Sequence, residues 1–287
     1  MSTAHPAGRT RPGIPLYDGY IFDLDGTIYL GDTLLPGAFA TLTRLRQLGK
    51  RVVFLSNNPT HSRFDYAAKL TRLGLPTPPA DIINSSVVMA DFLRRRMPGA
   101  RLFVVGEEPL HQELRAAGFG ISQAADGETV QPGQIDAVIA SFDRTFAYWK
   151  LQIAFDAIRQ GAHFFATNGD RYCPVPTTPA TPTGGQPDAA AVIAAIETCT
   201  NTRVEAIVGK PSAYMAAAIL VLLHLPPERC LMTGDRLETD VQMGLDAGMA
   251  AALTLTGATS AAAAAASPIR PTYIIDDLSA LVEGVDR

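Results

Sequence analysis

The sequence predicts an α/β protein with a doubly wound parallel sheet, and two patterns support this prediction. Short apolar runs alternate with longer segments of helical periodicity along the 287 residues. Most of the apolar runs have almost no polar interruption, as expected for parallel strands that are covered on both faces. Strands and helices therefore alternate along the chain, which is the order of a parallel sheet with helices on both of its sides.

The predicted strands are short and apolar, and they lie at residues 20–22, 51–55, 101–105, 137–140, 163–166, 204–208, 229–232 and 250–255. The predicted helices are longer, and they lie at residues 38–48, 62–73, 85–96, 109–117, 148–160, 188–198, 212–223 and 239–247. Glycine follows several of them, as at Gly49, Gly74 and Gly118, which is typical of helix C-termini. Residues 172–187 are rich in proline and glycine and predict a long loop.

The composition limits the classes of function. The formal net charge is −4, so no basic face for nucleic acid is expected. No apolar run reaches the roughly 18 residues of a membrane-spanning helix. The three cysteines have no metal-ligand spacing, which favours a reduced, cytoplasmic location. Residues 1–14 lack the central apolar stretch of a signal peptide, and we expect them to form a flexible tail.

Polar side chains follow four of the predicted strands, at the point where each strand ends. In an open parallel sheet, ligands bind outside the carboxyl ends of the strands, so these side chains are expected to meet at one edge. The candidates are Asp23 and Asp25 after the first strand, Ser56, Asn57 and Asn58 after the second, Lys210 after a later one, and Asp235 with Asp240 after another.

This mixture of groups suits the binding of a phosphate together with a metal ion. Crowded carboxylates repel one another unless a cation lies among them, and oxygen ligands of this kind suit Mg²⁺. Ser56, Asn57, Asn58 and Lys210 can receive the phosphate oxygens through hydroxyl, amide and ammonium hydrogens. A phosphate ester and Mg²⁺ are therefore the expected substrate and cofactor.

The spacing of the first two aspartates separates their expected roles. Asp23 ends its strand and is the predicted nucleophile, because an aspartate beside such a cation can attack phosphorus. Asp25 lies two residues later, on the turn that Gly26 makes, and is the predicted general acid and base. The charge that spreads over the phosphoryl oxygens would be offset by the metal and by Lys210.

These residues resemble a known family. The run DLDGT at residues 23–27, Ser56, Lys210 and the run GDRLETD at residues 234–240 are similar, in order and separation, to the four signatures of the haloacid dehalogenase superfamily. The resemblance extends from about residue 16 to the C-terminus. The sequences SNN at residues 56–58 and VGKPS at residues 208–212 are similar to those of subfamily IIA. That branch contains NagD-like, 4-nitrophenyl, pyridoxal phosphate, phosphoglycolate and glycerol-phosphate phosphatases.

The resemblance implies a fold, a ligand set and an assembly. The fold is a Rossmannoid core at residues 15–94 and 206–287, with an inserted α/β cap domain at residues 95–205. Mg²⁺ is held by Asp23, by the backbone carbonyl of Asp25 and by Asp235, with Asp240 as a nearby support. Family members often dimerise through the cap, so a homodimer is expected.

Residues of the expected cap are candidates for contacts with the substrate. Residues 166–174 resemble the segment that reaches over the active site in this family, which makes Asp170 and Tyr172 candidate substrate contacts. Cys173 stands where the pyridoxal phosphate branch has a histidine, and this departure argues against vitamin phosphates as main substrates. His61 follows the phosphate-binding loop closely and is a weaker candidate.

The predicted reaction is Mg²⁺-dependent hydrolysis of a small phosphate monoester through an aspartyl-phosphate intermediate. Sugar phosphates, glycerol phosphate, phosphoglycolate, nucleotides and 4-nitrophenyl phosphate all stay open as substrates. One alternative is a non-catalytic phospho-binding or signalling module. Another is an enzyme of the same fold with different chemistry, a dehalogenase or a phosphomutase. Asp25 argues against the module and the dehalogenase, because neither needs a second aspartate at this position.

Overall fold

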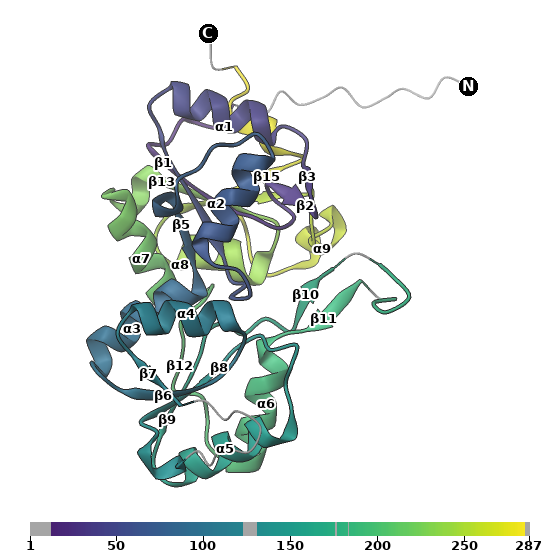
Figure 1. The fold of residues 1–287 in the computed structure, drawn as a ribbon. Coiled ribbons are helices and arrows are strands. Elements are labelled where there is room, and N and C mark those ends of the chain that lie inside the picture. Colours follow the sequence, from purple (N-terminus) through teal and green to yellow (C-terminus); the bar gives the residue numbers. More distant parts are fainter. Residues whose placement is uncertain (1–12, 123–130, 176, 183, 285–287) are drawn as a thin grey trace.

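The computed structural model describes residues 13–122, 131–175, 177–182 and 184–284, and most of the predicted tail at 1–14 lies outside them. Figure 1 shows two layered units, each built on a parallel sheet with helices packed around it. This arrangement confirms the predicted α/β class. Within the described part of the chain, no helix has the length and the apolar character needed to cross a bilayer.

The larger sheet has six parallel strands, which come from the N-terminal and the C-terminal parts of the described chain. Its order is β15-β14-β13-β1-β4-β5. β1 is central, and the bounds are β1 (Gly19–Asp23), β4 (Arg51–Ser56), β5 (Ile82–Asn84), β13 (Cys230–Gly234), β14 (Ala250–Thr254) and β15 (Tyr273–Ile275). A small hairpin, β2 (Tyr29–Leu30) with β3 (Thr33–Leu34), follows β1.

Helices cover both faces of the larger sheet. On one face lie α1 (Ala38–Gln47) and α2 (Arg63–Arg72), whose buried side chains join the cluster around Tyr20, Phe22 and Phe54. On the other face lie α3 (Ser85–Arg96), α7 (Ala213–Leu223) and α8 (Gln242–Asp246). A short helix, α9 (Ala261–Ala266), packs near β14. The core therefore has two apolar layers, one on each side of the strands.

The smaller sheet has five parallel strands in the order β12-β9-β8-β6-β7. The bounds are β6 (Arg101–Val105), β7 (Gly120–Ile121), β8 (Ala137–Ala140), β9 (His163–Ala166) and β12 (Ala206–Ile207). Its helices are α4 (Glu108–Ala116), α5 (Tyr148–Arg159) and α6 (Ala189–Thr200). β12 belongs to this sheet, although it begins one residue past the predicted end of the cap at residue 205. The predicted domain boundaries at 94/95 and 205/206 stay a prediction.

Phe92 on α3 joins the two units. Its ring lies edge-on to Phe165 of β9, with the centroids 5.0 Å apart, and edge-on to Tyr214 of α7 at 4.9 Å. One apolar cluster accordingly runs from the larger sheet to the smaller one. Packing of this kind holds the smaller unit over the carboxyl edge of the larger sheet.

Two sequence predictions differ from the structure. The predicted loop at 172–187 contains an antiparallel hairpin, β10 (Tyr172–Pro174) with β11 (Gly185–Pro187), which projects from the smaller unit beside the larger one (Figure 1). A two-stranded ribbon has open edges, and these tolerate proline. The predicted helix at 239–247 is a π-helical turn, Leu237–Val241, followed by α8.

Candidate active site

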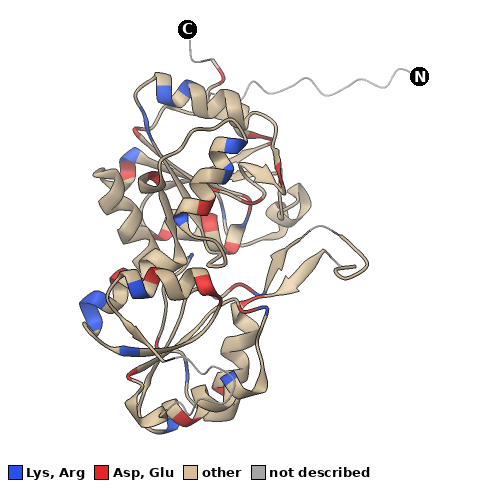
Figure 2. Cartoon of the chain, in the orientation of Figure 1, with Lys and Arg blue, Asp and Glu red and all other residues tan. Residues whose placement is uncertain are grey.

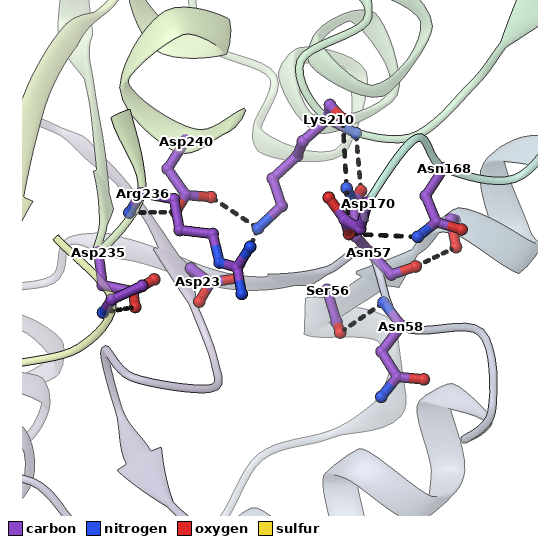
Figure 3. A network of polar contacts seen from close by, with 12 residues as sticks. Asp23, Ser56, Asn57, Asn58, Asn168, Asp170, Lys210, Asp235, Arg236 and Asp240 are labelled. Carbon is purple, nitrogen blue, oxygen red and sulfur yellow. Dashed lines mark hydrogen bonds and ion pairs between the residues drawn. The ribbon is translucent and has the colours of Figure 1, made fainter. Parts of the chain in front are cut away.

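Three neighbouring strands of the larger sheet end at the same edge and form the floor of the site. β1 lies between β4 and β13 in parallel register. Asp23 ends β1, Ser56 ends β4, and Asp235 comes directly after β13. Because parallel strands present their carboxyl ends together, these three side chains gather in one place, as Figure 3 shows.

Lys210 reaches this floor from the segment that returns from the smaller sheet to α7. Its Nζ donates to Asp23 Oδ1 at 2.5 Å and to Asp240 Oδ1 at 2.6 Å, and all three side chains are buried (Figure 3). Burial lowers the pKa of Lys210, but the two carboxylates outweigh burial and raise it above the ordinary value. Lys210 is therefore a fixed positive charge beside Asp23.

The pKa of Asp23 is shifted by several neighbours. Burial raises it well above the ordinary value, Lys210 opposes the rise, and the carboxylates of Asp240 and Asp235 add to it. Three acids so close together are poorly compensated by one ammonium. A further positive charge at this place would hold all three in the ionised form.

Asp23, Asp235 and Asp240 have the geometry of a metal-binding cluster. One carboxylate oxygen from each lies within 4.8 Å of the others. Asp235 Oδ2 accepts from the backbone N–H of Ala258 at 2.6 Å, whereas Asp235 Oδ1 is buried and has no hydrogen-bond partner among the described residues. Burial and the charge of Asp240 raise the pKa of Asp235 to about 6. An orphaned carboxylate oxygen among other oxygens fits a hard divalent cation.

Two glycines make room for the Asp235 carboxylate. A Cβ at Gly257 would lie 2.6 Å from both Cβ and Cγ of Asp235 and would overlap Oδ2. A Cβ at Gly26 would lie 2.9 Å from Asp235 Cγ, and Gly26 also has a φ of +86°, which favours glycine. Backbone from two loops therefore closes tightly around this carboxylate and fixes its position.

Asp25 has surroundings different from those of Asp23. Its side chain is exposed and lines the cavity above the floor. The protein around the cavity displaces water from the carboxyl and raises its pKa, while the positive charges of Lys69 and His61 oppose the rise. Its side chain lies outside the carboxylate cluster, so the metal role predicted for Asp25 rests on its backbone carbonyl.

The loop after β4 is closed by its own hydrogen bonds. Ser56 Oγ lies 3.1 Å from the hydroxyl of Tyr66 and accepts from the N–H of Asn58 at 3.1 Å. Asn58 Oδ1 accepts from both the N–H and the hydroxyl of Thr60. The loop thus holds the Ser56 hydroxyl on the cavity wall. His61 beyond it is exposed and packs edge-on against Tyr66.

The Asn57 side chain is fully used within the protein. Its Oδ1 accepts from the N–H of Lys210 at 2.7 Å. Its Nδ2 donates to the Lys210 carbonyl at 3.2 Å and to Asp170 Oδ2 at 3.1 Å. A side-chain amide has two N–H hydrogens, so both have partners here. Contacts of Asn57 with a substrate would therefore have to come from its backbone.

A cavity of about 60 Å³ lies between the two units. Residues of the larger unit line one side of it, and residues around the β10–β11 hairpin line the other. Both candidate contacts from the smaller unit, Asp170 and Tyr172, are on this wall. The lining residues are Asp23, Asp25, Ser56, Asn57, Asn58, Lys210, Arg236 and Thr239 on the first side, and Asp170, Tyr172, Cys173, Pro174 and Asp188 on the second.

A chain of hydrogen bonds supports the wall that the smaller unit contributes. Asn168 Nδ2 donates to Asp170 Oδ2 at 3.2 Å and to Asp188 Oδ1 at 3.0 Å. Asp188 also accepts from the N–H of Ala189 and so caps α6. Burial raises the pKa of Asp188 to about 6, against the effect of these hydrogen bonds. Asp170 links this chain to the larger unit through Asn57.

Five lining residues were missing from the sequence-based set: Cys173, Pro174, Asp188, Arg236 and Thr239. Cys173 and Pro174 lie inside the segment at 166–174 that was expected over the active site. Arg236 and Thr239 lie inside the run at 234–240, so their position in the signature was the available signal. Asp188 precedes a helix, where an acidic cap is the ordinary interpretation. Whether these residues line the cavity depends on how the two units face each other. The local sequence pattern of one strand or helix does not contain the relative orientation of the units.

Charges of both signs are interspersed over the two units. Figure 2 shows Lys and Arg as well as Asp and Glu on the helices and loops of both units, so neither sign is confined to one unit of the described chain. The buried acids at the edge of β1 and β13 are the main concentration of charge in the site. These acids need a cation to offset their negative charge, and a cation held there can in turn bind an anionic ligand.

Comparisons with known proteins agree with this geometry. A family model described as haloacid dehalogenase-like hydrolase matches residues 20–120, and a second model, of HAD hydrolase-like proteins, matches residues 207–281. The chain is 37% identical over 260 residues to the sugar-phosphatase AraL of Bacillus subtilis, covering 91% of this chain and 90% of that protein. It is 36% identical to human chronophin, covering 93% of each. The solved 4-nitrophenylphosphatase of Thermotoga maritima matches with a TM-score of 0.85 at 32% identity, covering 94% of this chain and 98% of that one.

Proposed function

The chain belongs to the haloacid dehalogenase-like hydrolases and is a phosphatase, and on this premise we propose that it transfers the phosphoryl group of a small phosphate monoester to Asp23 and then to water, with Mg²⁺ as its cofactor. The observation that carries the proposal is the position of Lys210. Its ammonium bridges Asp23 and Asp240, whose carboxylates cluster within 4.8 Å of that of Asp235. A buried charge so placed can stabilise negative charge as it develops on a phosphoryl group.

Asp23 is the nucleophile in this proposal. One of its carboxylate oxygens attacks phosphorus, the ester P–O bond breaks, and its electron pair leaves with the alcohol oxygen. Lys210 holds the Asp23 carboxylate in place and offsets charge on the phosphoryl oxygens. Ser56, which the closed loop holds at the cavity wall, donates its hydroxyl to one of these oxygens.

Asp25 is the general acid and base. Its raised pKa favours the protonated form, which gives a proton to the leaving alcohol. In the second half of the reaction, Asp25 takes a proton from the water that attacks the phosphorus of the aspartyl-phosphate. The P–O bond to Asp23 then breaks, and inorganic phosphate leaves. Asp25 is exposed and lines the cavity, which supports its proposed contact with both the alcohol and the water.

Asp23 and Asp235, together with the backbone carbonyl of Asp25, would hold Mg²⁺, with Asp240 in support. When bound, Mg²⁺ supplies positive charge that keeps the carboxylates ionised and polarises a phosphoryl oxygen. Gly257 and Gly26 fix Asp235 for this purpose, because their missing side chains leave space for its carboxylate. Asp235 would bind the metal through Oδ1, because Oδ2 already accepts a hydrogen bond from the N–H of Ala258.

The substrate is a small phosphate ester whose alcohol part faces the smaller unit. The relatives named as sugar, glycerol-3-phosphate, phosphoglycolate and 4-nitrophenyl phosphatases support this class, and their variety leaves the individual substrate open. Asp170 and Tyr172 are the proposed contacts with the alcohol. We also propose that residues 95–205 act as the cap, that two copies associate through it, and that the protein is cytoplasmic, in keeping with three free cysteines.

The test is phosphate release from a panel of phosphorylated metabolites and 4-nitrophenyl phosphate, with Mg²⁺ and with EDTA. Release that needs Mg²⁺ and no partner protein supports the phosphatase and argues against a signalling module. Activity that survives EDTA would revive metal-independent dehalogenase-type chemistry. Asp23→Asn should reduce the rate below a few per cent while circular dichroism stays the same, and a folded variant with more than about 10% of the rate would rule out Asp23 as nucleophile.

A further inference from the structure

Two cations line the cavity, and they have different partners. Lys210 is paired with Asp23 and Asp240 on the floor. Arg236 begins on the floor too, since its N–H donates to Asp240 Oδ2 at 3.1 Å, but its side chain extends into the centre of the residues in Figure 3. Among the described residues, the Arg236 guanidinium forms neither an ion pair nor a hydrogen bond. It is half-buried and holds five N–H donors that need acceptors.

The nearest acid of the smaller unit does not meet this need. Asp170 Oδ2 accepts from two side-chain amides, those of Asn57 and Asn168. The contact that Arg236 does make is with the Tyr172 ring, whose centroid lies 5.4 Å from the guanidinium carbon. Tyr172 comes from β10, so an aromatic side chain of the smaller unit supports a cation of the larger one. Stacking on a ring orients a guanidinium and leaves its edge donors free.

Tyr172, which the guanidinium contacts, belongs to the wall of the smaller unit, so Arg236 reaches the side of the cavity that the proposed mechanism gives to the alcohol part of the substrate. Asp23, Lys210 and Ser56 surround the phosphoryl group in the proposed mechanism, and residues of β10 line the opposite side of the cavity. Arg236 lies between these two sides. A planar fork of donors at this position matches a carboxylate or a second phosphate bidentately, and a neutral alcohol offers no such acceptor.

From this geometry, and resting on the proposed phosphatase function, we infer that Arg236 is a specificity-determining residue that binds an anionic group on the leaving alcohol. Tyr172 is its positioning residue. The preferred substrates are then small monoesters whose alcohol carries a carboxylate or second phosphate within a few bonds of the ester oxygen. Asp170 and Asp188 also line the cavity, so an anion needs Arg236 to offset their repulsion.

The test compares two esters of nearly equal shape, 2-phosphoglycolate and its neutral amide, 2-phosphoglycolamide. In the Mg²⁺-loaded wild-type protein, kcat/KM for the acid should exceed that for the amide by about 10- to 100-fold, as expected for a charge-assisted bidentate contact. Arg236→Gln should bring this ratio close to 1, and Arg236→Lys should retain part of it. The ratio is internal to each variant, so a partial loss of folded protein does not change it.

Two further variants separate the local contact from charge in general. Arg171→Gln removes the same charge from the exposed neighbour of Tyr172, which does not line the cavity, and should leave the ratio unchanged. Tyr172→Phe keeps the ring and should keep the ratio, whereas Tyr172→Leu should lower it by roughly 2- to 5-fold.

Three results would overturn the inference. A wild-type ratio near 1 would mean that no anionic group is recognised. An equal loss for both esters in Arg236→Gln would assign Arg236 to the transferring phosphoryl group instead. If Mg²⁺-dependent release were absent for every ester in the larger panel, the proposed function would fail and this inference with it. Turnover of both esters at equal kcat/KM would leave the proposed function standing and remove only the inference.

Discussion

The side-chain amide of Asn57 binds both backbone groups of Lys210, accepting from its N–H at 2.7 Å and donating to its carbonyl at 3.2 Å. The same amide donates to Asp170 of the smaller unit. Asn57 therefore holds the backbone of the lysine that contacts the nucleophile and, through Asp170, connects it to the opposite wall of the cavity. The contacts with Lys210 and Asp170 therefore explain why an asparagine stands at residue 57, without a side-chain contact to phosphate.

Asn57→Ala should lower kcat by about 10- to 100-fold with a smaller change in KM. A displacement of Lys210 by a fraction of an ångström weakens stabilisation of the transition state more than binding of the ester. The matched control is Asn168→Ala, which removes a neighbouring amide that binds Asp170 and Asp188 but not Lys210. Its effect should fall mainly on KM. Equal kcat for wild type and Asn57→Ala, measured by phosphate release, would show that Lys210 is positioned without this amide.

Asp25→Asn tests the assignment of the general acid. We expect kcat to fall by about 10²- to 10⁴-fold for an alkyl phosphate. For 4-nitrophenyl phosphate the fall in the first step should be smaller, because this leaving group departs without a proton. The control is Asp32→Asn, an exposed aspartate paired with Arg72, which should keep full activity. If the burst of nitrophenol from 4-nitrophenyl phosphate slows by the same factor as phosphate release from the alkyl ester, Asp25 does not protonate the alcohol.

The sequence predicted the floor of the site more fully than its walls. Asp23 and Ser56 end buried strands and Asp235 directly follows one, and the parallel arrangement of those strands is enough to bring such residues together. The three-residue strands β5 and β15 were not predicted, because segments so short carry little periodicity. They extend the sheet at its two edges and do not contribute to the floor.

The wall formed by the smaller unit could not be predicted in the same way. The prolines and glycines at 172–187 favour a loop, and the hairpin forms there because a two-stranded ribbon does not need every backbone N–H. Arg236 was recognised as part of a signature but not as a lining residue. Its orientation depends on Tyr172 of that hairpin, and tertiary contacts between distant segments are not encoded in a local pattern.

Gly257→Ala tests whether Asp235 must be held in place for metal binding. The added Cβ would lie 2.6 Å from Asp235 Cγ, so the carboxylate has to move. We expect the Mg²⁺ concentration for half-maximal activity to rise by at least about tenfold, as for loss of a supporting group at a metal site. Gly120→Ala is the matched control, since a Cβ there meets no atom of the described residues within 4 Å. An unchanged Mg²⁺ requirement in a folded Gly257→Ala protein would contradict the assignment of Asp235 as a ligand.

Asp188→Asn should change the pH dependence of stability. The carboxyl of Asp188 is buried, and its pKa is raised from 3.8 to about 6. The folded state thus binds more protons than the unfolded state between about pH 4 and pH 6, and stability must fall as the pH rises through this window. The full difference corresponds to about 3 kcal/mol.

Asparagine caps helices as well as aspartate does and carries no charge, so the variant should be free of this loss. Below about pH 4, wild type and Asp188→Asn should differ little in the free energy of unfolding. By pH 7 the variant should be the more stable by up to about 3 kcal/mol, a difference that urea titrations at half-unit intervals of pH can resolve. A difference that does not vary with pH would mean that Asp188 titrates alike in the folded and unfolded states. A wild type that gains on the variant as the pH rises would mean that its hydrogen bonds with Asn168 and Ala189 outweigh its burial.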